Sequence, residues 1–211
     1  MQVRIKVLLV FLILSALLVG ASCQPTAEQQ QARQDTPKPV EIHPADYFPL
    51  VTDSYWHYQG IGMEYAAFNR EVLFTRDSHA QIREENGGTV STSIYLLEDD
   101  QVKRIYFEGE TYFPQNLLTN LPAANDNTIL LKAPLKVGNS WDNTADHRRI
   151  MATNARVSTP SGVFTDCLQV EIKQDTSTTY EYYKEGVGLA KREFVAGEDK
   201  IISTLEDYSL K

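Results

Sequence analysis

The stretch Phe164-Thr165-Asp166-Cys167-Leu168-Gln169-Val170-Glu171-Ile172 decides the fold class. Apolar side chains at 164, 168, 170 and 172 alternate with polar ones at 165, 169 and 171, and Cys167 falls on the polar side. Successive side chains of a β-strand point to opposite faces, so this period of two predicts a strand with one buried face. We expect Cys167 to be a packed or shielded structural thiol, because the neighbouring Asp166 disfavours a reactive thiolate.

Similar strand-like segments follow one another along the chain and are separated by turn residues. Asn86-Gly87-Gly88 joins two of them, and its glycines supply the positive φ that tight hairpin turns need. Comparable turn sequences are Glu98-Asp99-Asp100, Pro160-Ser161-Gly162, Glu185-Gly186-Val187-Gly188 and Gly197-Glu198-Asp199. The segment 114–128, with its two prolines and several Asn, predicts a loop or a short helical excursion. The pattern predicts an all-β fold: mainly an antiparallel meander that forms a curved sheet, half-barrel or sandwich.

A faint internal repeat accompanies this pattern. Pro49-Leu50-Val51-Thr52-Asp53-Ser54-Tyr55-Trp56 aligns with Pro134-Leu135-Lys136-Val137-Gly138-Asn139-Ser140-Trp141, 85 residues later, and includes both tryptophans of the chain. Lys103-Arg104 and Lys191-Arg192 lie in corresponding hairpins, 88 residues apart. Two repeated halves, 47–131 and 132–211, would explain these matches, and coincidence is the alternative.

The amino-terminal segment indicates export. Arg4 and Lys6 precede the apolar run Val7–Val19, and the small residues Gly20-Ala21-Ser22 lead into Cys23. This layout is typical of a secretory signal peptide, here residues 1–22. The apolar run covers about 13 residues, whereas a membrane-spanning helix needs about 20.

A signal followed directly by cysteine resembles the lipobox of bacterial lipoproteins, although Gly20 stands where that family usually has Leu. The resemblance implies cleavage before Cys23, a diacylglyceryl thioether on its sulfur, and fatty acylation (palmitate) of the new amino terminus. The implied partner is a membrane, and the implied location is the extracytoplasmic side of the cell envelope. Gln24 is not the Asp that retains lipoproteins in the inner membrane, so the resemblance favours the outer membrane in a host with two membranes.

Residues 23–45 differ in composition from the rest of the chain. They are rich in Gln and Pro and contain no aromatic residue, so we interpret them as a lipidated end and a disordered tether, followed by one β domain at 46–211. Removal of residues 1–22, which carry Arg4 and Lys6 and no acid, takes the net charge from −8 to −10. This acidity repels the phosphate backbone and excludes nucleic acid as an expected partner. With Cys23 lipidated, Cys167 has no intrachain partner for a disulfide.

The second half has a recognisable pattern. Pro134 to Trp141, Pro160-Ser161-Gly162-Val163-Phe164, and the segment Tyr182 to Lys191 together are similar to a β domain of uncharacterised secreted proteins and lipoproteins of bacteria. This resemblance implies a fold and a compartment, and it brings no catalytic residues.

No motif in the sequence predicts a cofactor, a metal site or a catalytic residue. The histidines at 43, 57, 79 and 147 lack the i, i+2 or i, i+4 spacing of ligand pairs, and Asp146-His147 adjoins two arginines. Glu98-Asp99-Asp100 lacks the oxygen spacing of a calcium loop. Gly-x-Ser-x-Gly elbows and phosphate-binding glycine loops do not occur.

Aromatic residues are the abundant candidates for contacts with a ligand. We take Trp56, Tyr58, Trp141 and Tyr182 as candidate ligand-binding residues, while noting that aromatic side chains in strands mostly serve as core or as cross-strand pairs.

Three functions therefore remain open. We expect a membrane-anchored lipoprotein that acts as a non-catalytic binding or envelope-interaction module. A carrier of a lipid or another apolar ligand is the first alternative and predicts a cavity of a few hundred Å³. A hydrolase with an unidentified site is the second and predicts a polar cleft with at least two convergent titratable groups.

Overall fold

A computed structural model describes residues 42–211, so the predicted signal peptide, Cys23 and most of the tether lie outside the described residues. Twelve strands form one antiparallel sheet in the order β6-β5-β4-β3-β2-β1-β12-β11-β10-β9-β8-β7. The strands are β1 (Tyr55–Ile61), β2 (Phe68–Arg76), β3 (His79–Glu85), β4 (Val90–Leu97), β5 (Gln101–Gly109), β6 (Thr128–Lys132), β7 (Ser140–Asp142), β8 (His147–Thr159), β9 (Gly162–Lys173), β10 (Thr178–Lys184), β11 (Gly188–Ala196) and β12 (Asp199–Ser209). The predicted all-β, antiparallel fold is confirmed, and all five predicted turns join consecutive strands.

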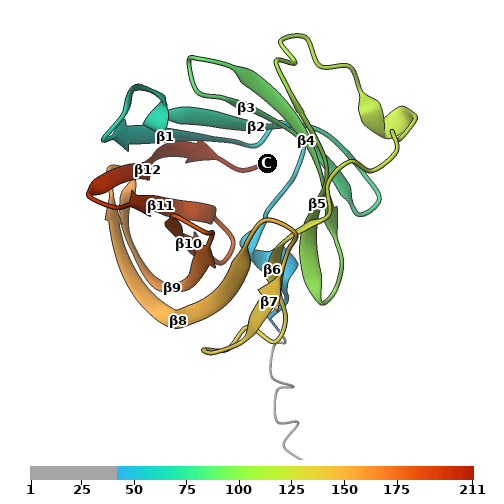
Figure 1. Cartoon of the computed structure of the whole chain (residues 1–211). Coiled ribbons are helices and arrows are strands. Elements are labelled where there is room, and N and C mark those ends of the chain that lie inside the picture. The colour runs from blue at the N-terminus through green and yellow to red at the C-terminus, as the bar shows by residue number, and fades with distance from the viewer. Residues whose placement is uncertain (1–41) are drawn as a thin grey trace, which may run out of the picture. The chain divides into compact units, whose positions relative to one another are not determined.

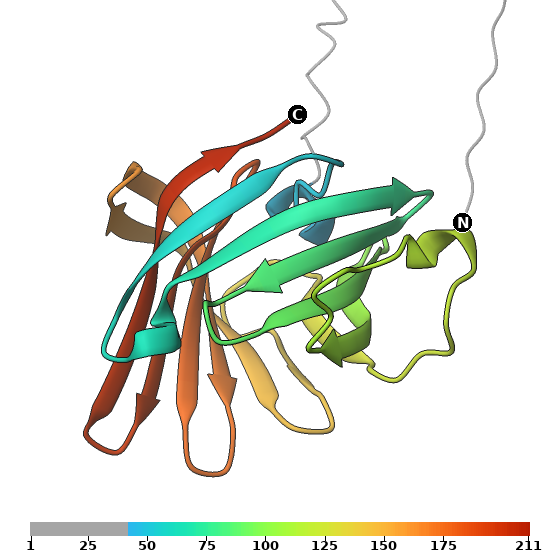
Figure 2. The same ribbon diagram turned by 90° about the horizontal axis from the view of Figure 1, so that it is seen from above.

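The sheet consists of two six-stranded meanders, β1–β6 and β7–β12, which are joined by pairing of β1 with β12. In Figure 1 the sheet curls so far that its two end strands, β6 and β7, lie next to each other. Figure 2 shows the strands of the first half crossing those of the second half. The result is a nearly closed, barrel-like sheet whose inner face receives side chains from both halves.

The two end strands of the sheet, β6 and β7, meet at a seam that is closed by side chains and not by backbone pairing. The amide of Asn143 accepts a hydrogen bond from Ile129 N (2.9 Å) and donates one to Ile129 O (3.1 Å), and Trp141 Nε1 also donates to Ile129 O (3.0 Å). Arg148 Nη1 donates to Leu130 O (3.2 Å). An unpaired strand edge would present free N–H and C=O groups, and these side chains satisfy them.

The two segments that share the Pro-Leu…Trp pattern have the same local structure. Asp53 N donates to Val72 O and Val72 N donates to Ser54 O, both at 2.9 Å, while Gly138 and Asn139 make the same two 2.9 Å bonds with Ile150. Asp53 and Gly138 both have positive φ, at 68° and 90°. Each turn thus locks the strand that follows it onto the second strand of its own half.

The hairpins that carry the two Lys-Arg pairs also correspond. The pairing of β4 with β5 shifts register between Ile94 and Tyr95, and the pairing of β10 with β11 shifts between Tyr182 and Tyr183. Both pairs of positions are 88 residues apart, which is also the spacing of the Lys-Arg pairs. The two halves therefore repeat a β-bulge as well as a turn.

Simple alternation predicted that Cys167 lies on the polar face of its strand, and this prediction is wrong. Cys167 and Leu168 are both completely buried, because Asp166 has a left-handed backbone (φ 55°) and the pairing of β8 with β9 is irregular around it. A bulge of this kind moves the following side chains to the other face. Burial raises the pKa of the Cys167 thiol, in keeping with the shielded structural role that we expected.

A short segment before β1 packs into the sheet. The 3-10 turn η2 (Pro44–Tyr47) leads to Phe48, whose ring lies between Tyr95 (centroids 6.3 Å apart) and Tyr183 (5.1 Å). Pro44, the last proline of the predicted tether, is buried in this segment. The other 3-10 turns are η3 (Glu64–Ala66) and η4 (Leu117–Thr119), the latter in the segment predicted as a loop or helical excursion. Within residues 42–211, none of these helical turns has the length and apolar character needed to cross a bilayer.

Candidate functional site

Side chains of both halves line a cavity of about 170 Å³ that is partly open to solvent. Four arginines line it, and they come from four strands: Arg70 (β2), Arg104 (β5), Arg148 (β8) and Arg192 (β11). Glu84, Glu181, Tyr95, Tyr183, Ser91 and Ser93 supply most of the other polar groups, and Ile82, Phe107 and Leu130 complete the lining. A partly open cavity lined by charged side chains is the most distinctive feature of the described residues.

The cavity is built from positions that correspond between the halves. Arg104 and Arg192 are 88 residues apart, as are Tyr95 and Tyr183. Arg70 and Arg148 each lie directly opposite a tryptophan in the register, Trp56 and Trp141 respectively. The two meanders thus contribute arginines and tyrosines at corresponding positions to one interior.

Each arginine has a carboxylate partner. Arg70 donates to Glu84 through Nε (3.0 Å) and Nη2 (2.7 Å), and Arg148 donates to Asp146 through Nε (3.0 Å) and Nη2 (3.1 Å).

The other two arginines pair through one nitrogen each. Arg192 Nε donates to Glu181 (2.9 Å), and Arg104 Nε donates to Asp126. Buried ions are tolerated when they are paired and hydrogen-bonded, so the four pairs allow charge to remain inside the sheet.

The pKa values of the two cavity carboxyls reflect these pairs. Burial opposes ionisation of Glu84, but Arg70 and Arg192 outweigh it and hold the pKa of Glu84 below its usual value. The same balance, set by burial against Arg192 and Arg148, lowers the pKa of Glu181. Burial and the nearby Glu181 raise the pKa of Tyr183 well above its ordinary value. The acids are therefore ionised and the phenol is neutral at physiological pH.

We predict that acid destabilises the fold through these carboxyls. A depressed folded-state pKa contributes stability that is complete above the unfolded pKa, near the usual 4.5 of Glu, and that is lost as the pH falls through the lower folded value. The free energy of unfolding from urea titrations should change little between pH 8 and 6 on account of Glu84 and Glu181, then fall steadily below about pH 4.5.

The Glu181→Gln variant is the control for this acid dependence. It removes one of the responsible groups, so its unfolding free energy should depend less steeply on pH in the acidic range. An identical slope in the variant and the parent would contradict the assignment.

Of the four aromatic residues proposed from the sequence as ligand contacts, Trp56, Tyr58 and Trp141 belong to one hydrophobic core cluster, and Tyr182 lies outside it. Trp56, Tyr58 and Trp141 are almost fully buried at 2%, 3% and 5% exposure, and their polar atoms donate to Val187 O, Leu189 O and Ile129 O. Gly188, next to the Trp56 indole, has φ 102°, a backbone conformation that other residues rarely adopt. Tyr182 is half-buried on the opposite face from Glu181 and Tyr183, where it accepts a hydrogen bond from Gln169. The three buried rings leave little surface for a ligand.

The cavity arginines were not predicted as site residues. A signal existed for two of them, because Arg104 and Arg192 belong to the repeated Lys-Arg pairs. No sequence signal indicated Arg70 or Arg148, because only the strand register places each of them opposite a tryptophan and inside the sheet.

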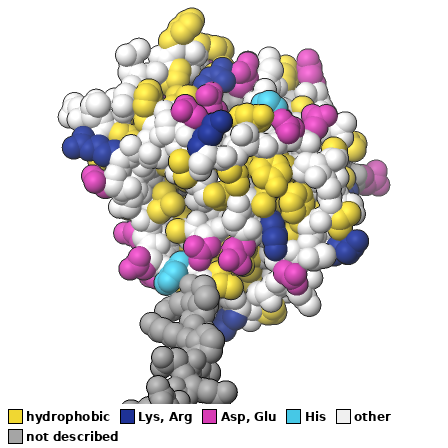
Figure 3. All heavy atoms as spheres, turned by 180° about the vertical axis from the view of Figure 1, so that it is seen from behind, with side chains coloured by type: hydrophobic (Ala, Val, Ile, Leu, Met, Phe, Trp, Pro, Cys, Tyr) yellow, Lys and Arg dark blue, Asp and Glu magenta, His cyan; other side chains and the backbone are white. Residues whose placement is uncertain are grey.

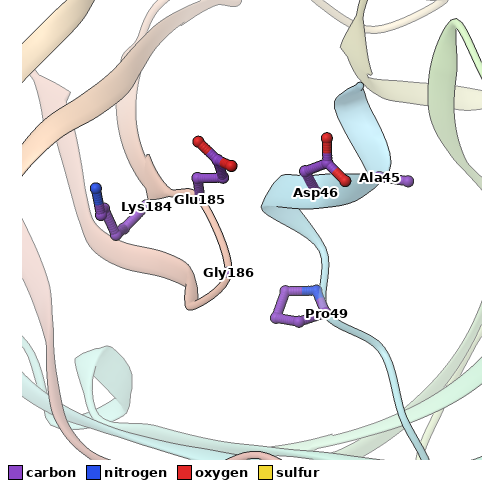
Figure 4. Close-up of a pocket in the computed structure, with 6 residues that line it drawn as sticks. All are labelled: Ala45, Asp46, Pro49, Lys184, Glu185 and Gly186. Atoms are coloured by element: carbon purple, nitrogen blue, oxygen red, sulfur yellow. The ribbon is translucent and has the colours of Figure 1, made fainter. Parts of the chain in front are cut away.

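Of the surface hollows in residues 42–211, two have a distinctive lining. The first is broad and open, and Figure 4 shows Asp46 and Glu185 on its facing walls, where Gly186 N donates to Asp46 O (2.8 Å). The second, of about 460 Å³, lies near η3 and has apolar walls from Met63, Tyr65, Phe68, Phe194 and Ile201. Two residues of the interior cavity, Glu84 and Arg192, also line this hollow. On the face seen in Figure 3, acidic, basic and apolar side chains are interspersed. Charge is thus concentrated in the interior cavity and mixed on this outer face.

Residues that could bind a metal ion do not converge in the described part of the chain. No group of three or more His, Cys, Asp or Glu side chains in residues 42–211 has a geometry that could hold one.

Comparisons with known proteins give two similar solved structures. One is from Parabacteroides distasonis and is assigned as a lipoprotein, with 14% identity, a TM-score of 0.48, and coverage of 77% of this chain and 98% of that one. The other is from Bacteroides fragilis and is assigned as an exported protein with a YMCC-like fold, with 14% identity, a TM-score of 0.48, and coverage of 76% and 97%. No protein-family model and no curated protein sequence matches the chain. A likeness of this degree does not establish a shared function.

Proposed function

We propose that the chain is a lipid-anchored extracytoplasmic protein and that its folded domain is a non-catalytic binding module. The anchor is supported by the order of Arg4 and Lys6, the apolar run 7–19 and the small residues before Cys23. Two or more acyl chains hold a protein stably at a membrane, and Gln24 favours the outer membrane where the host has one.

The interior cavity carries the binding part of this proposal. A space of about 170 Å³ that is walled by groups of both halves can surround a small ligand and contact it from several strands. Its carboxyls are neutralised by arginines, which lower the pKa values of Glu84 and Glu181. A general acid or base works best with a pKa near the working pH, so these groups suit binding better than catalysis.

An apolar ligand is the second candidate, and the hollow near η3 favours it. Met63, Tyr65, Phe68, Phe194 and Ile201 offer an apolar wall, and Met63 and Tyr65 are 46% and 45% exposed. An acyl chain or a similar group could bury this surface. The interior cavity has a polar, charged lining and does not suit such a ligand.

Binding in the cavity can be tested by native mass spectrometry of the full chain purified in detergent from its host. Ser93 lines the cavity and lies opposite Phe107 in the register, so Ser93→Leu fills the space without removing a charge. The parent should carry a small-molecule mass that the variant lacks. If both carried the same mass, the ligand would lie elsewhere, with the hollow near η3 as the first place to look.

The lipid anchor predicts the behaviour of Cys23→Ala. Without the thiol no thioether forms, so fractionation of the host should find the variant as uncleaved precursor or in the soluble fraction, while the parent stays with the membranes. Cys167→Ala is the matched control and should remain membrane-bound. Unchanged membrane retention and processing of Cys23→Ala would refute the anchor.

A further inference from the structure

We propose that the ligand of the interior cavity is a small molecule with an anionic group, a phosphate, sulfate or carboxylate, which the guanidinium groups of Arg104 and Arg192 bind. This inference rests on the proposed binding function and deepens it by naming the chemistry of the ligand.

The inference rests on the unused hydrogen-bond donors of Arg104 and Arg192. Arg148 uses Nε and both terminal nitrogens, two on Asp146 and one on Leu130 O. Arg104 and Arg192 each use only Nε, and within residues 42–211 their terminal nitrogens meet no hydrogen-bond acceptor. Both side chains keep 32% of their surface exposed while they line the cavity. Guanidinium groups in this state are suited to bind an oxyanion through paired N–H donors.

The charges around the cavity are balanced, so the unused donors decide what it can bind. Four guanidinium groups face the cavity, and Glu84 and Glu181 are the carboxylates of its lining. Asp126 and Asp146 pair with Arg104 and Arg148 from outside the lining, which gives four carboxylates for four arginines. The free terminal nitrogens of Arg104 and Arg192 remain as charged N–H donors at the cavity wall, and an oxyanion can accept hydrogen bonds from them.

Aromatic rings restrict the orientation of the two guanidinium groups, and the cavity volume restricts the size of the ligand. The guanidinium of Arg192 lies over the Phe68 ring (5.4 Å to the centroid) and that of Arg104 over the Phe107 ring (4.9 Å), which restricts both groups to defined planes. The cavity of about 170 Å³ equals the volume of about six water molecules, which suits one oxyanion with a small attached group. A polymer or a long acyl chain does not fit inside.

The test is isothermal titration calorimetry on the full chain in detergent. Sodium sulfate, sodium phosphate and sodium succinate are titrated at an ionic strength held constant with sodium chloride, and glucose serves as the neutral comparison. Arg104→Lys keeps a positive charge next to Asp126 but removes the terminal pair of donors, and Ser93→Leu fills the cavity. Arg149→Lys, exposed on the outer face of β8, is the matched control.

We expect saturable binding of at least one of the three anions, with an affinity at least about tenfold lower in Arg104→Lys and Ser93→Leu and unchanged in Arg149→Lys. Circular dichroism confirms that each variant is folded, and Ser93→Leu retains every charged group if Arg104→Lys does not fold. The absence of saturable binding to any anion, or equal affinity in Ser93→Leu, would overturn the inference. Saturable binding of glucose alone, lost in Ser93→Leu, would overturn the anionic ligand and leave the proposed cavity function standing.

Discussion

Replacing Trp141 by alanine should lower the free energy of unfolding by about 3–5 kcal/mol, because the substitution removes a large buried ring and leaves a cavity. Trp141 is 5% exposed, and its indole Nε1 donates to Ile129 O at 3.0 Å. The side chain therefore both fills the core and joins β7 to β6, which no backbone pairing holds together. Urea titration followed by circular dichroism measures the change.

Trp141→Phe separates the two contributions of this residue. Phenylalanine keeps most of the apolar volume and loses the indole donor, so the variant should lose about 1–2 kcal/mol, the cost of leaving a buried carbonyl partly unsatisfied. A near-zero loss of stability in Trp141→Ala, combined with a loss of ligand binding, would place this ring on a recognition surface.

The second large effect is expected for Glu181→Ala. The Glu181 side chain is 7% exposed and accepts hydrogen bonds from Arg192 and Tyr183. Its removal leaves the Arg192 guanidinium inside the sheet without its carboxylate, and breaking a buried pair from one side costs about 3–5 kcal/mol. We expect a loss of this size in the free energy of unfolding at pH 7.

Glu185→Ala is the control for charge removal, because Glu185 lies in the exposed β10–β11 turn of the same hairpin. An exposed substitution of this kind should change stability by no more than about 0.5 kcal/mol. If the two variants lost equal stability, the interior ion pairs would not contribute as the structure implies.

The strand and turn pattern could be predicted from the sequence because both signals are local. Turns can be predicted from the local sequences Asn86-Gly87-Gly88 and Pro160-Ser161-Gly162, and period-two alternation predicts the strands beside them. Cys167 marks the limit of this reasoning. The left-handed backbone of Asp166 moves Cys167 into the interior, and nothing in a run of alternating residues announces a bulge at that point.

The seam and the cavity depend on contacts between distant parts of the chain. The bond from Trp141 to Ile129 closes the sheet only because β6 and β7, the ends of two separate meanders, meet in space. Arg70 is inward-facing because of its register opposite Trp56, and a charged residue in an alternating strand is ordinarily assigned to the solvent face. The Lys-Arg repeat hinted at equivalent positions but could not indicate which face they occupy.

The central claim is that the interior cavity between the two halves is the working part of the molecule. A crystal structure of the full chain, extracted from its host and given no added anion, tests this claim most directly. We predict electron density of a small molecule in the cavity, with an anionic group against the terminal nitrogens of Arg104 and Arg192. A cavity that holds only water, or one that collapses so that these nitrogens bind Glu84 and Glu181, would contradict the account.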